Sequence, residues 1–349
     1  MPERHRPQRQ PGTQAGLGCV TPPDTAQPRL LNPRISTTTG GTTNGGTAHD
    51  RSRFRLRAGA AVVTTLIELP SGVREAVERH VGPVSTATEV TTGCNSDLAA
   101  VLSTRAGQVF VKGVEGVSRR MRFLRNEITA GELATGLAPE VMFSEDVDEW
   151  LVVGFEYLPG RSADLSPGSP DLSRVADVVR RIGELPAPGL RPIRARWGGV
   201  DWWAELAADA PQLAAGWDVD AMSALALAAP ELADGDRLVH SDLHGEQFLL
   251  GSDGDAHVID WGFPGAGAPW VDPAYLVLRL VEAGHEPSGA ETWARRELPA
   301  FAAVDDQTVT AFAAYIAGMW THWAVTDDEP GKQHRARLAR NYATWRLHR

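Results

Sequence analysis

The feature that most constrains this chain is a pair of aspartates, Asp242 and Asp260, which lie 18 residues apart beside short apolar runs. Residues 248–250 and 256–259 flank the turn sequence Ser-Asp-Gly-Asp, a pattern that predicts a β-hairpin. A hairpin brings its two ends together, so both carboxylates can reach one site. Such a pair suits phosphoryl transfer, in which one carboxylate accepts the proton of the attacking hydroxyl and the other holds magnesium.

The motifs around this pair resemble those of the aminoglycoside phosphotransferase family, which are small-molecule kinases. That family typically reads His-Gly-Asp-Leu-His-x-x-Asn, then Ile-Asp-Trp, then a stretch rich in Gly and Ala that ends in Asp-Pro. This chain has His240-Ser-Asp-Leu-His244, then Ile259-Asp-Trp261, then residues 265–273, which end in Asp-Pro. The resemblance runs from about Glu68 to the C-terminus. It implies an α+β, bilobal protein-kinase-like fold with a small antiparallel-sheet N-lobe and a larger, mostly helical C-lobe.

The resemblance also implies roles for single residues. Asp242 corresponds to the catalytic base and Asp260 to the magnesium ligand. His240 is expected to support the loop rather than to perform chemistry. Where the family has Asn, five residues after the base, this chain has Gln247. A Gln offers the same carbonyl on a longer arm, so Gln247 is a candidate ligand for a second magnesium.

Lys112 is the candidate phosphate-binding residue. The chain contains only two lysines, Lys112 and Lys332, against 32 arginines, and Lys112 lies in the β-like run of residues 108–114. A compact ammonium is not interchangeable with a guanidinium beside phosphates. On an alternating strand Lys112 shares a face with Phe110, which directs the amine toward a cleft or the core. The alternative is a half-exposed strand lysine.

Two further elements complete the expected nucleotide site. The family resemblance implies that a helix glutamate pairs with Lys112, and Glu127, in a helix expected over residues 118–135, is favoured over Glu132. Residues 92–97 resemble the turn that covers the phosphates, with Gly93 and Ser96 as candidate contacts. A plain hairpin turn is the alternative there, since Gly93 is its only glycine.

Composition divides the chain into three regions. Residues 1–62 are rich in Pro, Gly, Thr and Arg and are expected to be a disordered basic leader, or the product of a mis-assigned start codon. Residues 63–158 are expected to form the N-terminal nucleotide-binding lobe. Residues 159–349 are expected to form the C-terminal catalytic and substrate lobe, with helices at 171–185, 201–215, 219–229, 271–283, 291–302, 307–324 and 333–347. Asp272 is a candidate N-cap for one of them, and the family resemblance implies instead a structural or substrate-side acid.

The overall charge limits the partners. A formal net charge of −10, with an acidic body, argues against nucleic acid or an anionic membrane and favours cationic ligands. No apolar run is long enough to cross a membrane, and two cysteines cannot form a disulfide framework, so the cytoplasm is the expected location. The sequence leaves open whether the protein is a monomer or a homodimer.

These observations predict magnesium-dependent transfer of the γ-phosphate of ATP or GTP to a hydroxyl of a small molecule. By analogy the acceptor is an amine-bearing molecule such as an aminoglycoside, which would make the protein an antibiotic-resistance enzyme. A macrolide or another small metabolite is an alternative acceptor. A protein kinase is less favoured, because only 12 residues separate Asp260 from Asp272 and leave no long activation segment. A nucleotide-binding pseudokinase that acts as an interaction module is the non-enzymatic alternative.

Overall fold

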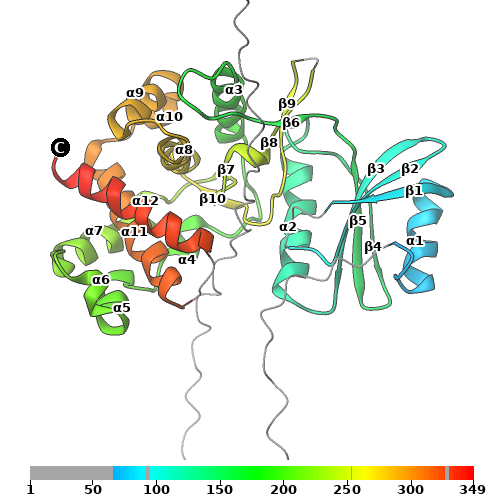
Figure 1. The fold of residues 1–349 in the computed structure, drawn as a ribbon, viewed down its shortest axis with the longest axis horizontal. Helices are drawn as coiled ribbons and strands as arrows, with labels where there is room; N and C mark the ends of the chain where they lie inside the picture. Colours follow the sequence, from blue (N-terminus) through cyan, green and yellow to red (C-terminus); the bar gives the residue numbers. More distant parts are fainter. Residues whose placement is uncertain (1–65, 91–94, 253, 327–329) are drawn as a thin grey trace, which may run out of the picture.

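The computed structural model of the chain describes residues 66–90, 95–252, 254–326 and 330–349. The leader expected at residues 1–62 and Gly93 of the expected phosphate-binding turn lie outside the described residues. The described chain has two parts, an antiparallel sheet with two helices and a larger, mostly helical part (Figure 1). The α+β bilobal fold predicted from the sequence is therefore confirmed. The division of the chain at residue 158, just after the last strand of the large sheet, stays a prediction.

Five antiparallel strands form the sheet of the N-terminal lobe, in the order β1-β2-β3-β5-β4. The strands are β1 (Val84–Glu89), β2 (Leu98–Thr104), β3 (Gly107–Glu115), β4 (Val141–Val147) and β5 (Trp150–Glu156). The two helices are α1 (Ser71–Val81), which precedes the sheet, and α2 (Arg119–Leu133), which connects β3 to β4. In Figure 1 these helices cover opposite faces of the sheet.

The alternation of side chains along β3 determines which helix each residue meets. Val111 packs in a buried cluster with Val77 of α1, whereas Phe110 packs against the cluster that contains Leu124 of α2. Lys112 is two residues after Phe110 and points to the α2 side. The prediction that Phe110 and Lys112 share a face is confirmed.

The C-terminal lobe is built around α11, most of whose side chains are buried. Helices α5, α7 and α12 pack against it. Its helices are α3 (Asp171–Glu184), α4 (Ile193–Trp197), α5 (Trp202–Asp209), α6 (Pro211–Ala214), α7 (Val219–Leu232), α8 (Val271–Glu282), α9 (Pro287–Glu297), α10 (Pro299–Ala302), α11 (Asp306–Thr326) and α12 (Pro330–Leu347). Within the described residues, none of the helices combines the length and apolar character needed to cross a bilayer.

Short strands hold the loops between the lobes. The predicted hairpin is present as β8 (Phe248–Leu250) and β9 (Ala256–Val258), and β6 (Arg161–Ser162) pairs with the outer side of β8. A second pair joins β7 (Arg237–Val239) to β10 (Gly265–Gly267). Both pairs are antiparallel, so the loop after β7 and the segment after β9 lie next to each other.

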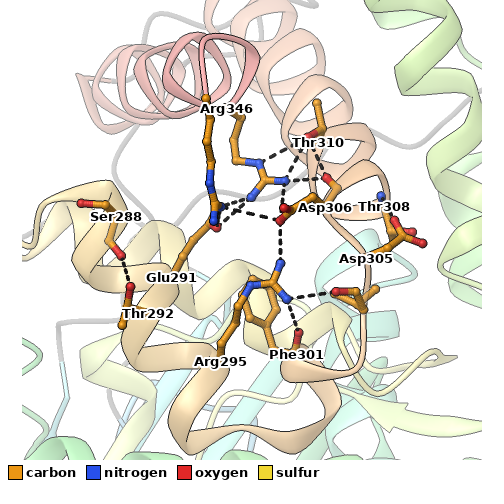
Figure 2. A network of polar contacts seen from close by, with 12 residues as sticks. Ser288, Glu291, Thr292, Arg295, Phe301, Asp305, Asp306, Thr308, Thr310 and Arg346 are labelled. Atoms are coloured by element: carbon orange, nitrogen blue, oxygen red, sulfur yellow. Dashed lines mark hydrogen bonds and ion pairs between the residues drawn. The ribbon is translucent and has the colours of Figure 1, made fainter.

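A buried ionic network fixes α12 to the rest of the lobe (Figure 2). Glu291 of α9 and Arg346 of α12 are 2% and 5% exposed, and both carboxylate oxygens of Glu291 lie 2.7 Å from Nη1 of Arg346. Tyr342 donates a further hydrogen bond of 2.6 Å to Glu291, and Arg346 reaches Thr310 of α11. Three helices are thereby joined around one carboxylate.

Proline accounts for the main differences from the expected helices. The helix expected over residues 201–215 is two helices, because Pro211 begins the second. The helix expected over 291–302 begins earlier, at Pro287, and is interrupted before Pro299. Proline has no N–H to continue a helix and is favoured in the first turn of a new one. Helix α4 was not predicted, since five residues are too few to show a helical period.

Candidate active site

Lys112 joins the two lobes by bonding to carboxylates from both. Its Nζ lies 3.0 Å and 2.8 Å from the two carboxylate oxygens of Glu127, which is buried on α2. The same Nζ lies 3.2 Å from Oδ1 of Asp260, 148 residues away. The alternative partner, Glu132, is exposed and is not among the carboxylates that Lys112 contacts in the described chain. The pairing expected between Lys112 and Glu127 is thus present, and its role toward a nucleotide stays a prediction.

Burial and charge set the protonation of this trio. Burial opposes the charged form of Lys112, but Glu127 and Asp260 outweigh it and raise the pKa of its ammonium. Burial alone would raise the pKa of Asp260, but the positive charge of Lys112 has the larger effect and lowers this pKa below its usual value. Burial raises the pKa of Glu127 to about 7, against the lowering effect of Lys112. The group that stays ionised through the neutral range alongside Lys112 is therefore Asp260, as a metal ligand must be.

Asp242 lies in the loop after β7, and a histidine connects this loop to Asp260. The backbone N–H of Asp242 donates to Nδ1 of His240 at 3.3 Å, so the other nitrogen, Nε2, carries the proton. That Nε2 donates to the carbonyl of Ile259 at 3.2 Å, immediately before Asp260. His240 is 1% exposed and packs against Trp261. These contacts agree with the supporting role expected for His240.

Ser241 and Asp260 both have left-handed backbone conformations, with φ of 64°. Non-glycine residues adopt this region rarely and only when their surroundings hold them there. Asp272 supplies this support for Ser241, because its carboxylate accepts the backbone N–H groups of His240 at 2.8 Å and Ser241 at 2.7 Å. The expectation that Asp272 caps a helix is wrong. It lies inside α8, is 3% exposed and orders the loop that contains Asp242, which makes it the structural acid that the resemblance implied.

A buried arginine that the sequence analysis missed bonds to Asp242. Nη2 of Arg279, on α8, lies 3.1 Å from Oδ1 of Asp242, and its Nη1 lies 3.0 Å from Glu282. Burial, aided by the charge of Arg279, lowers the pKa of His244 to about 2, so this histidine is neutral. No motif marks Arg279, because it is one of 32 arginines and lies 37 residues from Asp242.

The residues around Asp260 fit a magnesium ion. Gln247 is 5% exposed, and its Oε1 is buried without a hydrogen-bond partner among the described residues. Its backbone carbonyl accepts the N–H of Ile259 at 2.9 Å, so Gln247 and Asp260 are held on neighbouring segments. Amide and carboxylate oxygens are the ligands that magnesium prefers. An unpaired buried carbonyl oxygen is costly unless a ligand uses it.

A cavity of about 350 Å³ opens beside Asp242. Segments from both lobes line it, including α2, the loop after α3, α4, α8, α11 and α12. Lys112, Glu127 and Asp260 are not among its lining residues. The cavity therefore reaches Asp242 without being lined by the Lys112 trio.

The family model described as the phosphotransferase enzyme family (APH) matches residues 114–307, which is more than half of the chain. The chain belongs to this family. The matched region of this phosphotransferase contains the candidate residues Glu127, Asp242, Gln247 and Asp260. Its members, and the structural neighbours described next, are small-molecule kinases that phosphorylate hydroxyl groups, so the protein is an enzyme of that kind.

Solved structures with the same fold support this assignment. The choline kinase LicA from Streptococcus pneumoniae aligns with 78% of this chain and 97% of its own, at 15% identity and a TM-score of 0.55. Aminoglycoside phosphotransferase APH(4)-Ia, in a ternary complex with ADP and hygromycin B, aligns with 79% of this chain and 98% of its own, at 17% identity and a TM-score of 0.53. Spectinomycin phosphotransferase APH(9)-Ia, bound to AMP, aligns with 77% of this chain and 92% of its own, at 14% identity and a TM-score of 0.50. No curated protein sequence matches the phosphotransferase significantly.

Ser96, a predicted nucleotide contact, lies apart from this cluster. It is buried before β2 and, within the residues that the structure describes, forms no hydrogen bond with Lys112, Glu127 or Asp260. Its neighbour Asp97 ties the same segment to the end of β3 and to α2, through the N–H of Glu115 at 3.0 Å and the guanidinium of Arg120 at 2.6 Å. A role for Ser96 toward phosphates stays a prediction, as does that of Gly93.

Proposed function

We propose that this phosphotransferase moves the γ-phosphate of ATP or GTP to a hydroxyl of a small molecule with the help of magnesium. The bond between the γ-phosphorus and the bridging oxygen breaks, and a bond from phosphorus to the acceptor oxygen forms. The nucleoside diphosphate leaves, and the proton of the acceptor hydroxyl passes to the carboxylate of Asp242. Magnesium, held by Asp260 and Gln247, would neutralise phosphate charge when bound.

The observation that carries this proposal is the meeting of Lys112, Glu127 and Asp260 at one point, next to the loop of Asp242. Glu127 holds the ammonium of Lys112 in a fixed place, where it can bind phosphate oxygens. Arg279 and His240 fix the carboxylate and the backbone of Asp242. Positioning and charge stabilisation supply most of the catalysis in phosphoryl transfer, so a site built of such contacts suits this reaction.

The test is release of ADP or GDP across a panel of small alcohols, with nucleotide binding measured separately by calorimetry. We expect Asp242→Asn to lower kcat by about 100-fold or more while nucleotide still binds. We expect Lys112→Met to weaken nucleotide binding. If nucleotide binds and no acceptor is phosphorylated, the pseudokinase alternative replaces this proposal.

The amine-bearing acceptor expected by analogy is not favoured by the residues around Asp242. Aminoglycosides carry several positive charges, and a site for them needs carboxylates. Among the described residues that line the cavity, Asp242 is the only carboxylate. The acceptor proposed here is therefore a small alcohol that does not carry several positive charges.

A further inference from the structure

Arginines surround the cavity beside Asp242. They come from three separate regions of the fold, namely α2, the segment around α4, and α12. The lining arginines are Arg119, Arg122, Arg191, Arg196 and Arg335. Asp242 is the single carboxylate of the lining, so arginines outnumber carboxylates there by five to one, although the whole chain has a net charge of −10. Arg196 and Arg191 are the two that would lie nearest an anion bound beside Asp242.

Arg196 is the most informative of these arginines. Its Nη1 donates to the carbonyl of Phe263 at 2.7 Å, and its Nη2 donates to Oγ of Ser241 at 2.8 Å, next to Asp242. Both acceptors are neutral, and no carboxylate of the described residues forms an ion pair with this guanidinium. Burial lowers its pKa, which shows that the surroundings disfavour the charge. Arg196 is only half-buried, and a partly buried cation with no ion-pair partner among the described residues carries a desolvation cost that an anionic ligand would offset.

The rest of the cavity is aromatic. Buried rings line it: Trp197, Tyr275, Tyr315, Trp320 and Trp323. Burial raises the pKa of both tyrosines, so their phenols stay neutral and add no negative charge. Such walls suit a flat apolar body, and a volume of about 350 Å³ is at the small end of ligand sites.

Aromatic walls can also hold an ammonium group through cation–π contacts. Two features oppose this use here. Arg279 already lies over the ring of Trp320, 5.5 Å from its centroid, so a cation of the protein occupies that contact. An ammonium ligand would also lie among the arginines, and like charges placed together at a binding site cost affinity.

We propose that the acceptor is an anionic alcohol, a small molecule with an apolar ring-sized body, a hydroxyl group and its own carboxylate or phosphate. The hydroxyl faces Asp242, the ring lies against the aromatic walls, and the acidic group bonds to Arg196, with Arg191 at the rim. A guanidinium matches the geometry of carboxylates and phosphates. This inference rests on the phosphotransfer proposed above.

A matched set of ligands tests the charge preference. 4-(Hydroxymethyl)benzoate, 4-(hydroxymethyl)benzylamine and 4-methylbenzyl alcohol share a ring and a hydroxymethyl group, and differ in carrying a carboxylate, an ammonium or a methyl group. 4-(Hydroxymethyl)phenyl phosphate separates phosphate from carboxylate as the acidic group. Binding of each to the full chain, loaded with magnesium and a non-hydrolysable ATP analogue, is measured by calorimetry. Turnover with ATP is measured by ADP release.

We expect at least one of the two anionic ligands to bind about 10- to 100-fold more tightly than the ammonium ligand. Arg196→Gln should remove about 10-fold or more of this preference and leave the methyl ligand unaffected. Arg191→Gln, at an exposed position, should weaken anion binding by a smaller factor. This variant tests the inference independently if Arg196→Gln fails to fold. Arg194→Gln is the matched control, since Arg194 lies on α4 but pairs with Glu231 and does not line the cavity.

Equal or tighter binding of the ammonium ligand, or no binding of either anionic ligand, overturns the inference. The inference is also overturned if Arg196→Gln lowers the affinity for all ligands equally and Arg191→Gln leaves the affinity for every ligand unchanged. An anion preference without ADP release would leave the inference standing and would instead contradict the proposed phosphotransfer. The two proposals therefore fail in different measurements.

Discussion

Nη2 of Arg279 lies 3.1 Å from Oδ1 of Asp242, which joins the last turn of α8 to the loop after β7. Arg279 is 3% exposed and also bonds to Glu282. Because the guanidinium is held by α8 and by Trp320, it fixes the direction of the Asp242 carboxylate. Arg279 is thus a positioning residue for the proposed base.

Replacing Arg279 should affect turnover more than binding. We expect Arg279→Met to lower kcat by roughly 100-fold, as is typical for a misplaced catalytic group, with little change in KM for the nucleotide. Steady-state kinetics with an active acceptor measure both quantities. Glu282→Gln removes the other ionic partner of Arg279 and is the control, for which we expect a much smaller loss. Equal losses of kcat in the two variants would contradict a specific role toward Asp242.

Gln247 should matter for the metal and not for the stability of the metal-free protein. Its Oε1 has no partner among the described residues, so Gln247→Leu removes a buried polar atom without breaking a hydrogen bond of that oxygen. We expect the free energy of unfolding without metal to be unchanged or higher, by up to about 1 kcal/mol. We expect the magnesium concentration for half-maximal activity to rise. A clear loss of stability without metal, with an unchanged magnesium requirement, would mean that Gln247 is only structural.

The network around Glu291 should contribute strongly to stability (Figure 2). Arg346→Met leaves the carboxylate of Glu291 buried without the two 2.7 Å contacts that it has from Nη1 of Arg346. Breaking a buried ion pair from one side costs about 3–5 kcal/mol when the remaining charge has no other partner. Arg349 still lies 2.7 Å from Oε2 of Glu291 and Tyr342 still donates to Oε1, so we expect a loss of about 2–3 kcal/mol. Urea unfolding measures this loss. Arg194→Met, which breaks the exposed pair with Glu231, should cost about 1 kcal/mol or less.

Asp171 gives stability a defined dependence on pH. Its carboxylate accepts two bonds from Arg161, at 2.6 Å and 2.8 Å, and these lower its pKa from 3.8 to about 2. A carboxyl group whose pKa is lower in the folded state stabilises the fold above its unfolded pKa, and loses that contribution as pH falls toward the folded pKa. We expect Asp171→Asn to be less stable than the parent at pH 6 by about 1–2 kcal/mol, since exposed Arg161 is partly screened. The difference in thermal midpoint between the parent and Asp171→Asn should become smaller below pH 4. A difference that grows as the pH falls would contradict a lowered pKa for Asp171.

The sequence allowed the prediction of contacts that local pattern or spacing determines. Alternation along a strand placed Lys112 opposite α2, and the hairpin placed Asp260 near the loop of Asp242. Contacts that depend on packing between distant segments had no such signal. Arg196 lies on a five-residue helix between proline and glycine residues, and Arg279 lies in an ordinary amphipathic pattern. Asp272 was misassigned because a carboxylate before a proline looks like a cap, whereas the folded chain uses it for two N–H groups of another loop.

The contact between Lys112 and Asp260 makes the ammonium the counter-charge of a carboxylate that would otherwise repel Glu127, and it links the two lobes through one side chain. Under the function proposed above, a divalent ion held by Asp260 would supply this counter-charge instead, and the ammonium would be available to phosphate oxygens. The same positive charge would then serve first the structure of the protein and afterwards the binding of its nucleotide.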